Sequence, residues 1–124
     1  MKINGLTIRT NDLEKSKVFY RDYLGMVIES EFSPFEGTHI VILTAENAMS
    51  IELLFNVRAN IKADNSGVSF GMHSSKYEQL LQTAREENIV TDGPRILGGR
   101  FECFFITDPN GVGIQVTREI SEKM

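Results

Sequence analysis

The sequence predicts an α+β domain in which two β-α-β-β-β modules form a concave, partly open sheet around a central cavity. Two observations support this fold class. Segments with helical spacing and segments rich in β-branched and aromatic residues occur in the same order twice along the chain. A shift of 63 residues also superimposes the two halves, because it places Glu52 over Gln115 and Asn47 over Asn110. Each module would leave one face of a curved sheet uncovered, so the two modules are expected to enclose a shared concavity.

The first module, residues 1–58, begins with a predicted strand over Lys2–Arg9. The following run, TNDLEKSKVFYRDYLGM, is predicted to be a helix with Asn11 or Asp12 as its N-cap and Gly25 at its end. The apolar residues at helical spacing in this run are Leu13, Tyr20 and Leu24.

Three strands complete the first module, in MVIESEF, THIVILTA and AMSIELLF. A two-residue turn at Glu46-Asn47 is predicted between the last two strands. This turn would pair Glu52 with Val41. It would also place His39 opposite Leu54, on the face that carries Glu52. His39 is therefore expected to line the cavity, and a structural or solvent-facing histidine is the alternative.

The second module, residues 67–124, repeats this order after a polar linker at residues 59–66. Its first strand, GVSFGMH, precedes a helix that is predicted to open with a capping box at Ser75 and Glu78. The remaining strands are predicted in NIVTDGPRI, RFECFFIT and VGIQV. The predicted buried face of the helix consists of Tyr77, Leu80, Leu81 and Ala84.

Charge and composition restrict the expected partners and location. Thirteen basic and seventeen acidic residues are dispersed along the 124-residue chain and give a net charge of −4, so nucleic acid is not an expected partner. No apolar run approaches the roughly 20 residues that cross a bilayer, and the N-terminal segment lacks the apolar core of a signal peptide. We therefore expect a cytoplasmic protein without a membrane partner. Cys103 is the only cysteine, and its phenylalanine neighbours favour buried packing over reactivity.

Three motifs resemble the vicinal oxygen chelate superfamily: NDLEKSKVFYRDYLGM after the first strand, IELLF at the end of the first module, and DPNGVGIQV at the end of the second. This superfamily contains glyoxalase I, extradiol dioxygenases, fosfomycin-resistance enzymes, methylmalonyl-CoA epimerase and bleomycin-resistance proteins. The resemblance covers essentially the whole chain. It implies the fold and leaves the reaction open, because one fold supports many functions.

Enzymes of this superfamily hold one divalent metal through four positions, which the resemblance places at Gly5, Glu52, Val68 and Gln115. Glu52 keeps the family's glutamate. Gly5 and Val68 stand where histidine is usual and offer no side-chain donor, while Gln115 offers a neutral amide. His73 lies five residues beyond Val68 and is expected to be too distant to replace it. Because a catalytic divalent ion generally takes three or four donors, neither a metal nor another cofactor is expected.

The predicted site lies on the strand faces that carry these four positions, because side chains two residues apart share a face. Apolar walls with a few polar groups suit a small organic molecule. Phe105 takes the position of a pocket tyrosine in fosfomycin-resistance proteins, although the phenylalanines would equally fill a collapsed core. The predicted ligand-binding residues are Thr7, His39, Glu52, Leu54, Phe70, Phe101, Cys103, Phe105 and Gln115.

Glu52 has three possible roles, in this order of preference. It could pair with a cationic or hydrogen-bond-donating ligand, or it could be a vestige of a metal site that Gln115 satisfies. It could also be a catalytic residue, because a desolvated carboxylate can accept or donate a proton near neutral pH.

The sequence therefore predicts a metal-independent protein that binds a small hydrophobic or amphipathic molecule, as bleomycin-resistance proteins sequester a drug. The alternative is a glyoxalase-like lyase or isomerase that uses a divergent metal site, or Glu52 as an acid or base. A regulatory or scaffold protein is a third class. A homodimer is expected, because the strands in INGLTI and GVSFGM would otherwise leave unpaired edges in water.

Overall fold

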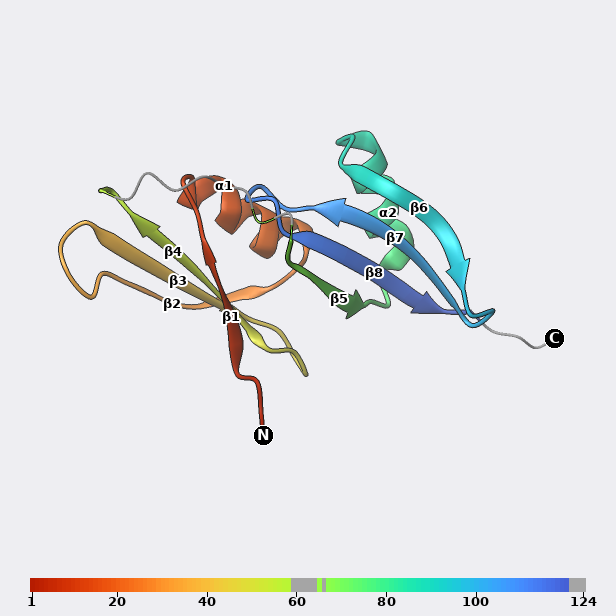
Figure 1. Ribbon diagram of the computed structural model, residues 1–124, viewed down its shortest axis with the longest axis horizontal. Helices are drawn as coiled ribbons and strands as arrows, with labels where there is room; N and C mark the ends of the chain where they lie inside the picture. The colour runs from red at the N-terminus through yellow and green to blue at the C-terminus, as the bar shows by residue number, and fades with distance from the viewer. Residues whose placement is uncertain (59–64, 66, 121–124) are drawn as a thin grey trace. The chain divides into compact units, whose positions relative to one another are not determined.

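The computed structural model describes residues 1–58, 65 and 67–120, and the chain divides into two compact units, Met1–Asp64 and Asn65–Met124 (Figure 1). Most of the predicted linker, residues 59–64 and 66, lies outside the described residues. None of the helices in the described part of the chain is long and apolar enough to cross a membrane. The elements are, in chain order, β1 (Gly5–Arg9), α1 (Leu13–Lys17), η1 (Val18–Tyr23), β2 (Val27–Phe32), β3 (Thr38–Thr44), β4 (Ser50–Asn56), β5 (Ser69–His73), α2 (Tyr77–Glu86), β6 (Val90–Leu97), β7 (Phe101–Thr107) and β8 (Gly113–Glu119).

Each unit contains one four-stranded sheet (Figure 1). The strand order is β1-β4-β3-β2 in the first sheet and β5-β8-β7-β6 in the second. The opening strand of each unit pairs in parallel with the last strand, and the other pairings are antiparallel. The predicted α+β fold with two β-α-β-β-β modules is therefore confirmed.

The helical segment of the first unit begins and ends as its sequence predicts. Asp12 is the N-cap, and its carboxylate accepts a hydrogen bond from the Lys15 N–H at 3.0 Å. After α1 the chain widens into the π-helix η1, in which the Leu24 N–H reaches the Phe19 carbonyl at 3.1 Å. Gly25 follows with φ of 81°, a conformation that glycine adopts without strain.

One face of the first sheet forms the core of its unit against the helical segment, which contacts β4. Tyr20 of η1 is fully buried, and Ser16 of α1 shares a hydrogen bond of 2.9 Å with Thr10. The buried side chains alternate along the strands, as expected for a sheet with one covered face. They are Ile8, Val41, Leu43, Ile51 and Leu53.

The second sheet is covered in the same way by α2, which contacts β6 and β8. The Tyr77 ring meets Phe104 edge to face with 5.1 Å between centroids, and the tyrosine hydroxyl donates to Glu102 at 3.2 Å. Burial, followed by the Glu102 charge, raises the pKa of Tyr77. The predicted buried face of this helix is confirmed, because all of its members are buried: Tyr77, Leu80, Leu81 and Ala84.

The predicted capping box of α2 is wrong. The helix begins at Tyr77. Lys76 occupies the N-cap position, and its side chain makes no capping hydrogen bond. The Ser74 hydroxyl accepts from the Lys76 N–H at 3.0 Å, so a serine turn precedes the helix and moves its start beyond Ser75.

The DPNG motif is a tight turn between β7 and β8. One carboxylate oxygen of buried Asp108 accepts from the N–H groups of Asn110 and Val112, both at 2.8 Å. Gly111 closes the turn with φ of 88° and donates its N–H to the Asp108 carbonyl at 3.2 Å. In the first unit, the Ala48 N–H donates to the Ala45 carbonyl, also at 3.2 Å. The two turns therefore repeat with the predicted shift of 63 residues.

Candidate functional site

Glu52 lies on the face of the first sheet that is opposite its helical core. The parallel register between β1 and β4 pairs Glu52 with Thr7, and the Thr7 hydroxyl donates to the Glu52 carboxylate at 2.7 Å. Leu54 lies two residues along the same face, and Ile42 of β3 pairs directly with Glu52. The half-buried carboxylate thus lies between the aliphatic side chains of Ile42 and Leu54 and accepts a hydrogen bond from one hydroxyl. Thr7 and Leu54 are beside Glu52, where the sequence predicted them.

His39 is on the other face, so its predicted place beside Glu52 is wrong. The register pairs His39 with Phe55, with 6.1 Å between ring centroids, and Glu52 with Ile42. The connection between β3 and β4 has five residues, 45–49, where a two-residue turn was predicted. The change from two to five loop residues shifts the β3-β4 register by one residue. A shift of one residue places the side chains of β3 on the opposite face relative to Glu52.

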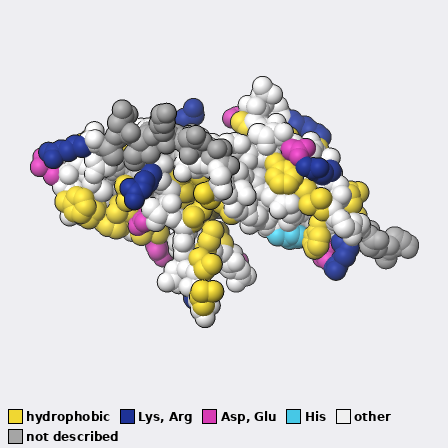
Figure 2. Space-filling model, viewed as in Figure 1, with side chains coloured by type: hydrophobic (Ala, Val, Ile, Leu, Met, Phe, Trp, Pro, Cys, Tyr) yellow, Lys and Arg dark blue, Asp and Glu magenta, His cyan; other side chains and the backbone are white. Residues whose placement is uncertain are grey.

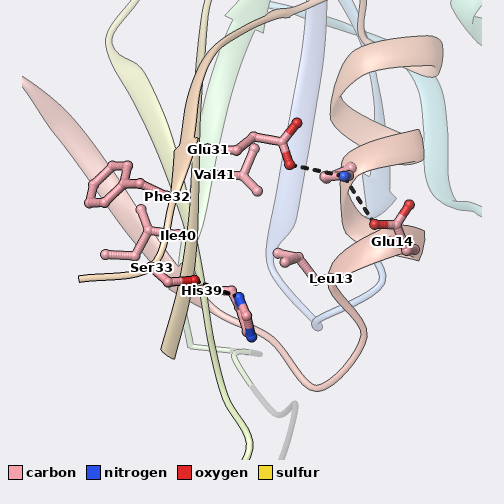
Figure 3. Close-up of a pocket in the computed structure, with 9 residues that line it drawn as sticks. Leu13, Glu14, Glu31, Phe32, Ser33, His39, Ile40 and Val41 are labelled. Carbon is pink, nitrogen blue, oxygen red and sulfur yellow. Dashed lines mark hydrogen bonds and ion pairs between the residues drawn. The ribbon is translucent and has the colours of Figure 1, made fainter. Parts of the chain in front are cut away.

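His39 instead lines a pocket of about 330 Å³ between α1 and the β2-β3 pair (Figure 3). Its Nδ1 atom hydrogen-bonds the Ser33 hydroxyl at 2.8 Å. The Lys17 ammonium links the two sides of the pocket. It contacts Glu14 of α1 at 3.0 Å and Glu31 of β2 at 3.1 Å (Figure 3). Hydrogen bonds to Glu14 and then Glu31 raise the pKa of Lys17. The single Lys17 cation balances only one of the two carboxylates, so these three side chains leave a net negative charge at the pocket wall.

Gln115 lies on the face of the second sheet opposite α2. Its antiparallel partner is Phe105, and Cys103 pairs with Thr117 one step further along the same face. Phe101 pairs with Glu119 and remains 37% exposed, while Cys103 is fully buried. The predicted grouping of these three β7 residues with Gln115 is therefore confirmed, as is the buried packing of Cys103.

The face predicted for β5 is wrong. Parallel pairing aligns Phe70 with Ile114, which is a core residue on the α2 side, and aligns Gly71 with Gln115. Phe70 therefore faces the helix and does not lie beside Gln115. Val68 precedes the strand, and Ser69 pairs with Gly113 as Gly5 pairs with Ser50 in the first unit. The two opening strands thus correspond with a shift one residue longer than the rest of the repeat.

His73 is the residue that sequence reasoning missed. It pairs with Thr117 on the face of Gln115, and its Nδ1 atom is 3.0 Å from the Thr117 hydroxyl. The Phe101 ring lies perpendicular to the imidazole, with 6.4 Å between centroids. Figure 2 shows histidine at the surface of the second unit beside hydrophobic side chains. The strict alternation in GVSFGMH was the available signal, since its apolar residues belong on the covered face.

The four family positions do not form a donor set that fits a divalent metal. A Cβ atom on Gly5 would lie 2.9 Å from the Ser50 carbonyl oxygen, so β1 approaches β4 too closely for a side chain there. Val68 is an apolar residue before β5. Glu52 and Gln115 remain as a carboxylate and a neutral amide, fewer donors than a divalent site generally requires. In residues 1–58, 65 and 67–120 there is no group of three His, Cys, Asp or Glu side chains that could hold an ion.

Sequence comparison identifies one family. Residues 2–116 match the family model of the Glyoxalase/Bleomycin resistance protein/Dioxygenase superfamily. A search of curated protein sequences finds no significant match.

Solved structures share the fold at low sequence identity. The chain is similar to a trypanothione-dependent glyoxalase I from Leishmania major, with 22% identity and a TM-score of 0.76 over 95% of this chain and 86% of the other. It is also similar to TnmS3, an antibiotic-binding protein from Streptomyces sp. CB03234, with 15% identity and a TM-score of 0.71 over 97% of both chains. A glyoxalase family protein from Enterococcus faecalis has 17% identity and a TM-score of 0.72, over 94% of this chain and 96% of the other. A glyoxalase I and an antibiotic-binding protein therefore share this fold.

Proposed function

The chain belongs to the Glyoxalase/Bleomycin resistance protein/Dioxygenase superfamily, and from this premise we propose that it is a metal-independent member that binds a small hydrophobic or amphipathic molecule. The ligand contacts a sheet face that the helix of that unit leaves uncovered. TnmS3 offers a precedent in the fold, since it is an antibiotic-binding protein.

One observation carries this proposal: on the uncovered face of the first sheet, aliphatic side chains adjoin one carboxylate, with Arg9 of β1 beside Leu54 at the edge of this group. Ile42 and Leu54 flank Glu52, and Phe32 on the same face is 46% exposed. Thr7 supplies one hydrogen bond to the carboxylate and leaves further acceptor capacity for a ligand donor. A hydrophobic surface with one oriented polar group is the composition that small-molecule sites use.

Native mass spectrometry of protein purified from its own host tests the proposal directly. We expect a small organic molecule to co-purify in a constant ratio to the chain and to be released on denaturation. Protein that carries no such molecule, and that shows no melting shift with amphipathic amines or aromatic acids, would contradict the proposal.

The purified protein is expected to contain no stoichiometric divalent metal, because Gly5 and Val68 supply no donor. Elemental analysis after mild dialysis measures this. One equivalent of zinc, nickel, manganese or iron that is lost in Glu52→Gln would show that the divergent site binds metal after all. The matched control is Glu29→Gln, which removes an exposed carboxylate from β2 without touching the family positions.

A glyoxalase-like lyase or isomerase is the second candidate. The Thr7–Glu52 hydrogen bond favours it, because a carboxylate held in one orientation by a neighbouring donor can act as an acid or base. Product formation that disappears in Glu52→Gln while substrate still binds would support this candidate over a binding protein.

We also propose that the protein is a homodimer in solution. In the described residues, β1 pairs only with β4 and β5 pairs only with β8, so each sheet ends in an edge strand. Multi-angle light scattering at micromolar concentration is expected to give twice the chain mass of 14.0 kDa. A mass of one chain would contradict the dimer.

A further inference from the structure

We propose that His73 recognises the ligand by accepting a hydrogen bond at Nε2 from an O–H or N–H group on an aromatic ring. This inference rests on the proposed function, because it assigns a residue and a ligand class to the uncovered face of the second sheet. His73 is exposed on that face, whereas the chain's other histidine lies on the helical side of the first sheet.

The hydrogen bonds around Thr117 determine which imidazole nitrogen carries the proton. The Thr117 hydroxyl is 3.2 Å from the Met72 carbonyl oxygen and 3.0 Å from His73 Nδ1. A hydroxyl has one proton, and a carbonyl can only accept, so the proton of Thr117 points to Met72. His73 Nδ1 must then donate to the hydroxyl oxygen. In the neutral imidazole this leaves Nε2 without a proton, as an acceptor.

The surroundings of Nε2 leave space for a ligand and favour an aromatic one. In the part of the chain that the structure describes, no group hydrogen-bonds Nε2 of His73. Gly71 lies two residues before it on the same face, and among residues 1–58, 65 and 67–120 a Cβ atom there would meet only Gln115, at 3.7 Å from the amide oxygen and 3.9 Å from the carbonyl oxygen. Next to His73 lies the exposed ring of Phe101, which can pack against an aromatic ligand. The Gln115 amide supplies a second donor and acceptor nearby.

The protonation pattern can be measured without any ligand. Two-bond ¹H–¹⁵N spectra in alkaline buffer distinguish protonated from unprotonated ring nitrogens, and the chain has only two histidines. We expect Nδ1 of His73 to be protonated and Nε2 to be unprotonated. Thr117→Val should remove this preference, because valine has no oxygen to accept from Nδ1. His39→Gln assigns the signals and should leave the His73 pattern unchanged. A protonated Nε2 in the wild-type protein would overturn the inference and leave the proposed function standing.

Two matched probes test recognition of the donor. 4-Methylphenol and 4-methylanisole differ in the O–H group, so the phenol should bind roughly 2- to 12-fold more tightly, the effect of one neutral hydrogen bond. His73→Phe should abolish this difference. NMR titration that shows no preference for the phenol at His73 would overturn the inference, whereas the proposed function fails only if neither the natural ligand nor the amphipathic panel binds.

A steric variant tests where the probe lies. Gly71 does not have a positive φ, and its Cβ would make ordinary contacts, so Gly71→Leu should fold and should place a bulky side chain beside His73 on the same face. We expect it to abolish 4-methylphenol binding. Gly67→Leu is the matched control, since no atom of the described residues lies within 4 Å of a Cβ atom at Gly67 and its φ is not positive, and it should bind the phenol normally. Unchanged binding by Gly71→Leu would overturn the proposed location.

Discussion

Phe104→Ala is expected to lower the free energy of unfolding by about 3–5 kcal/mol, the range for truncating a buried phenylalanine. The Phe104 ring is fully buried between the second sheet and α2, where it meets Tyr77 edge to face. Truncation would remove this contact and leave a cavity that the surrounding strands cannot fill. Chemical denaturation followed by far-UV circular dichroism measures the change.

Phe105→Ala is the matched control, because it makes the same chemical change at the adjacent residue. Phe105 lies on the uncovered face opposite Gln115 and is only half-buried. Its truncation should cost clearly less stability and should weaken ligand binding, while Phe104→Ala should affect binding only through folding. Equal losses of stability in the two variants would show that the faces of β7 are assigned wrongly.

Glu52→Gln is expected to weaken ligand binding by roughly 1.5–3 kcal/mol, the range for a hydrogen bond to a charged group. The glutamine oxygen can still accept from the Thr7 hydroxyl, which lies 2.7 Å from the carboxylate. The substitution therefore removes the charge and preserves the local hydrogen bond. Thermal melting with and without a panel of amphipathic amines and aromatic acids compares the two proteins.

The alternatives for Glu52 predict other patterns. A vestigial carboxylate would give a variant that melts at the same or a higher temperature, with every ligand shift unchanged, because the cost of desolvating the charge is removed. Acid-base catalysis would preserve binding and abolish turnover. Thr7→Val removes the hydroxyl donor and keeps the charge, so it separates the contribution of orientation from that of charge.

Much of the fold could be predicted because its signals are local or repeat along the chain. The Asp12 cap and the Gly25 stop depend on neighbouring residues, and the structure confirms both. The buried face of α2 follows from helical spacing and is confirmed. The duplicated module follows from self-similarity, and the same shift relates the strand pairings of the two units. The shift that places Glu52 over Gln115 also places Ile42 over Phe105. In the structure, Ile42 pairs with Glu52 and Phe105 pairs with Gln115.

The errors in the candidate site have one physical cause. A strand has a period of two residues, so an error of one residue in register or alignment reverses every face of that strand. A turn taken as two residues placed His39 beside Glu52, although it lies on the helical side. A repeat taken as uniform placed Phe70 beside Gln115, although Phe70 lies on the α2 side and His73 lies on the face of Gln115.

The sequence by itself determined the superfamily, the order of the elements and the loss of side-chain donors at Gly5 and Val68, since each is a property of residue identity or local spacing. Only the tertiary structure decided which side chains share a face with Glu52 and Gln115. Strand pairing depends on hydrogen bonds between residues that are distant in the chain, and a single additional residue in a connection changes it. For this reason the Thr117–His73 hydrogen bond and the close approach of Gly5 to Ser50 emerged only from the folded chain.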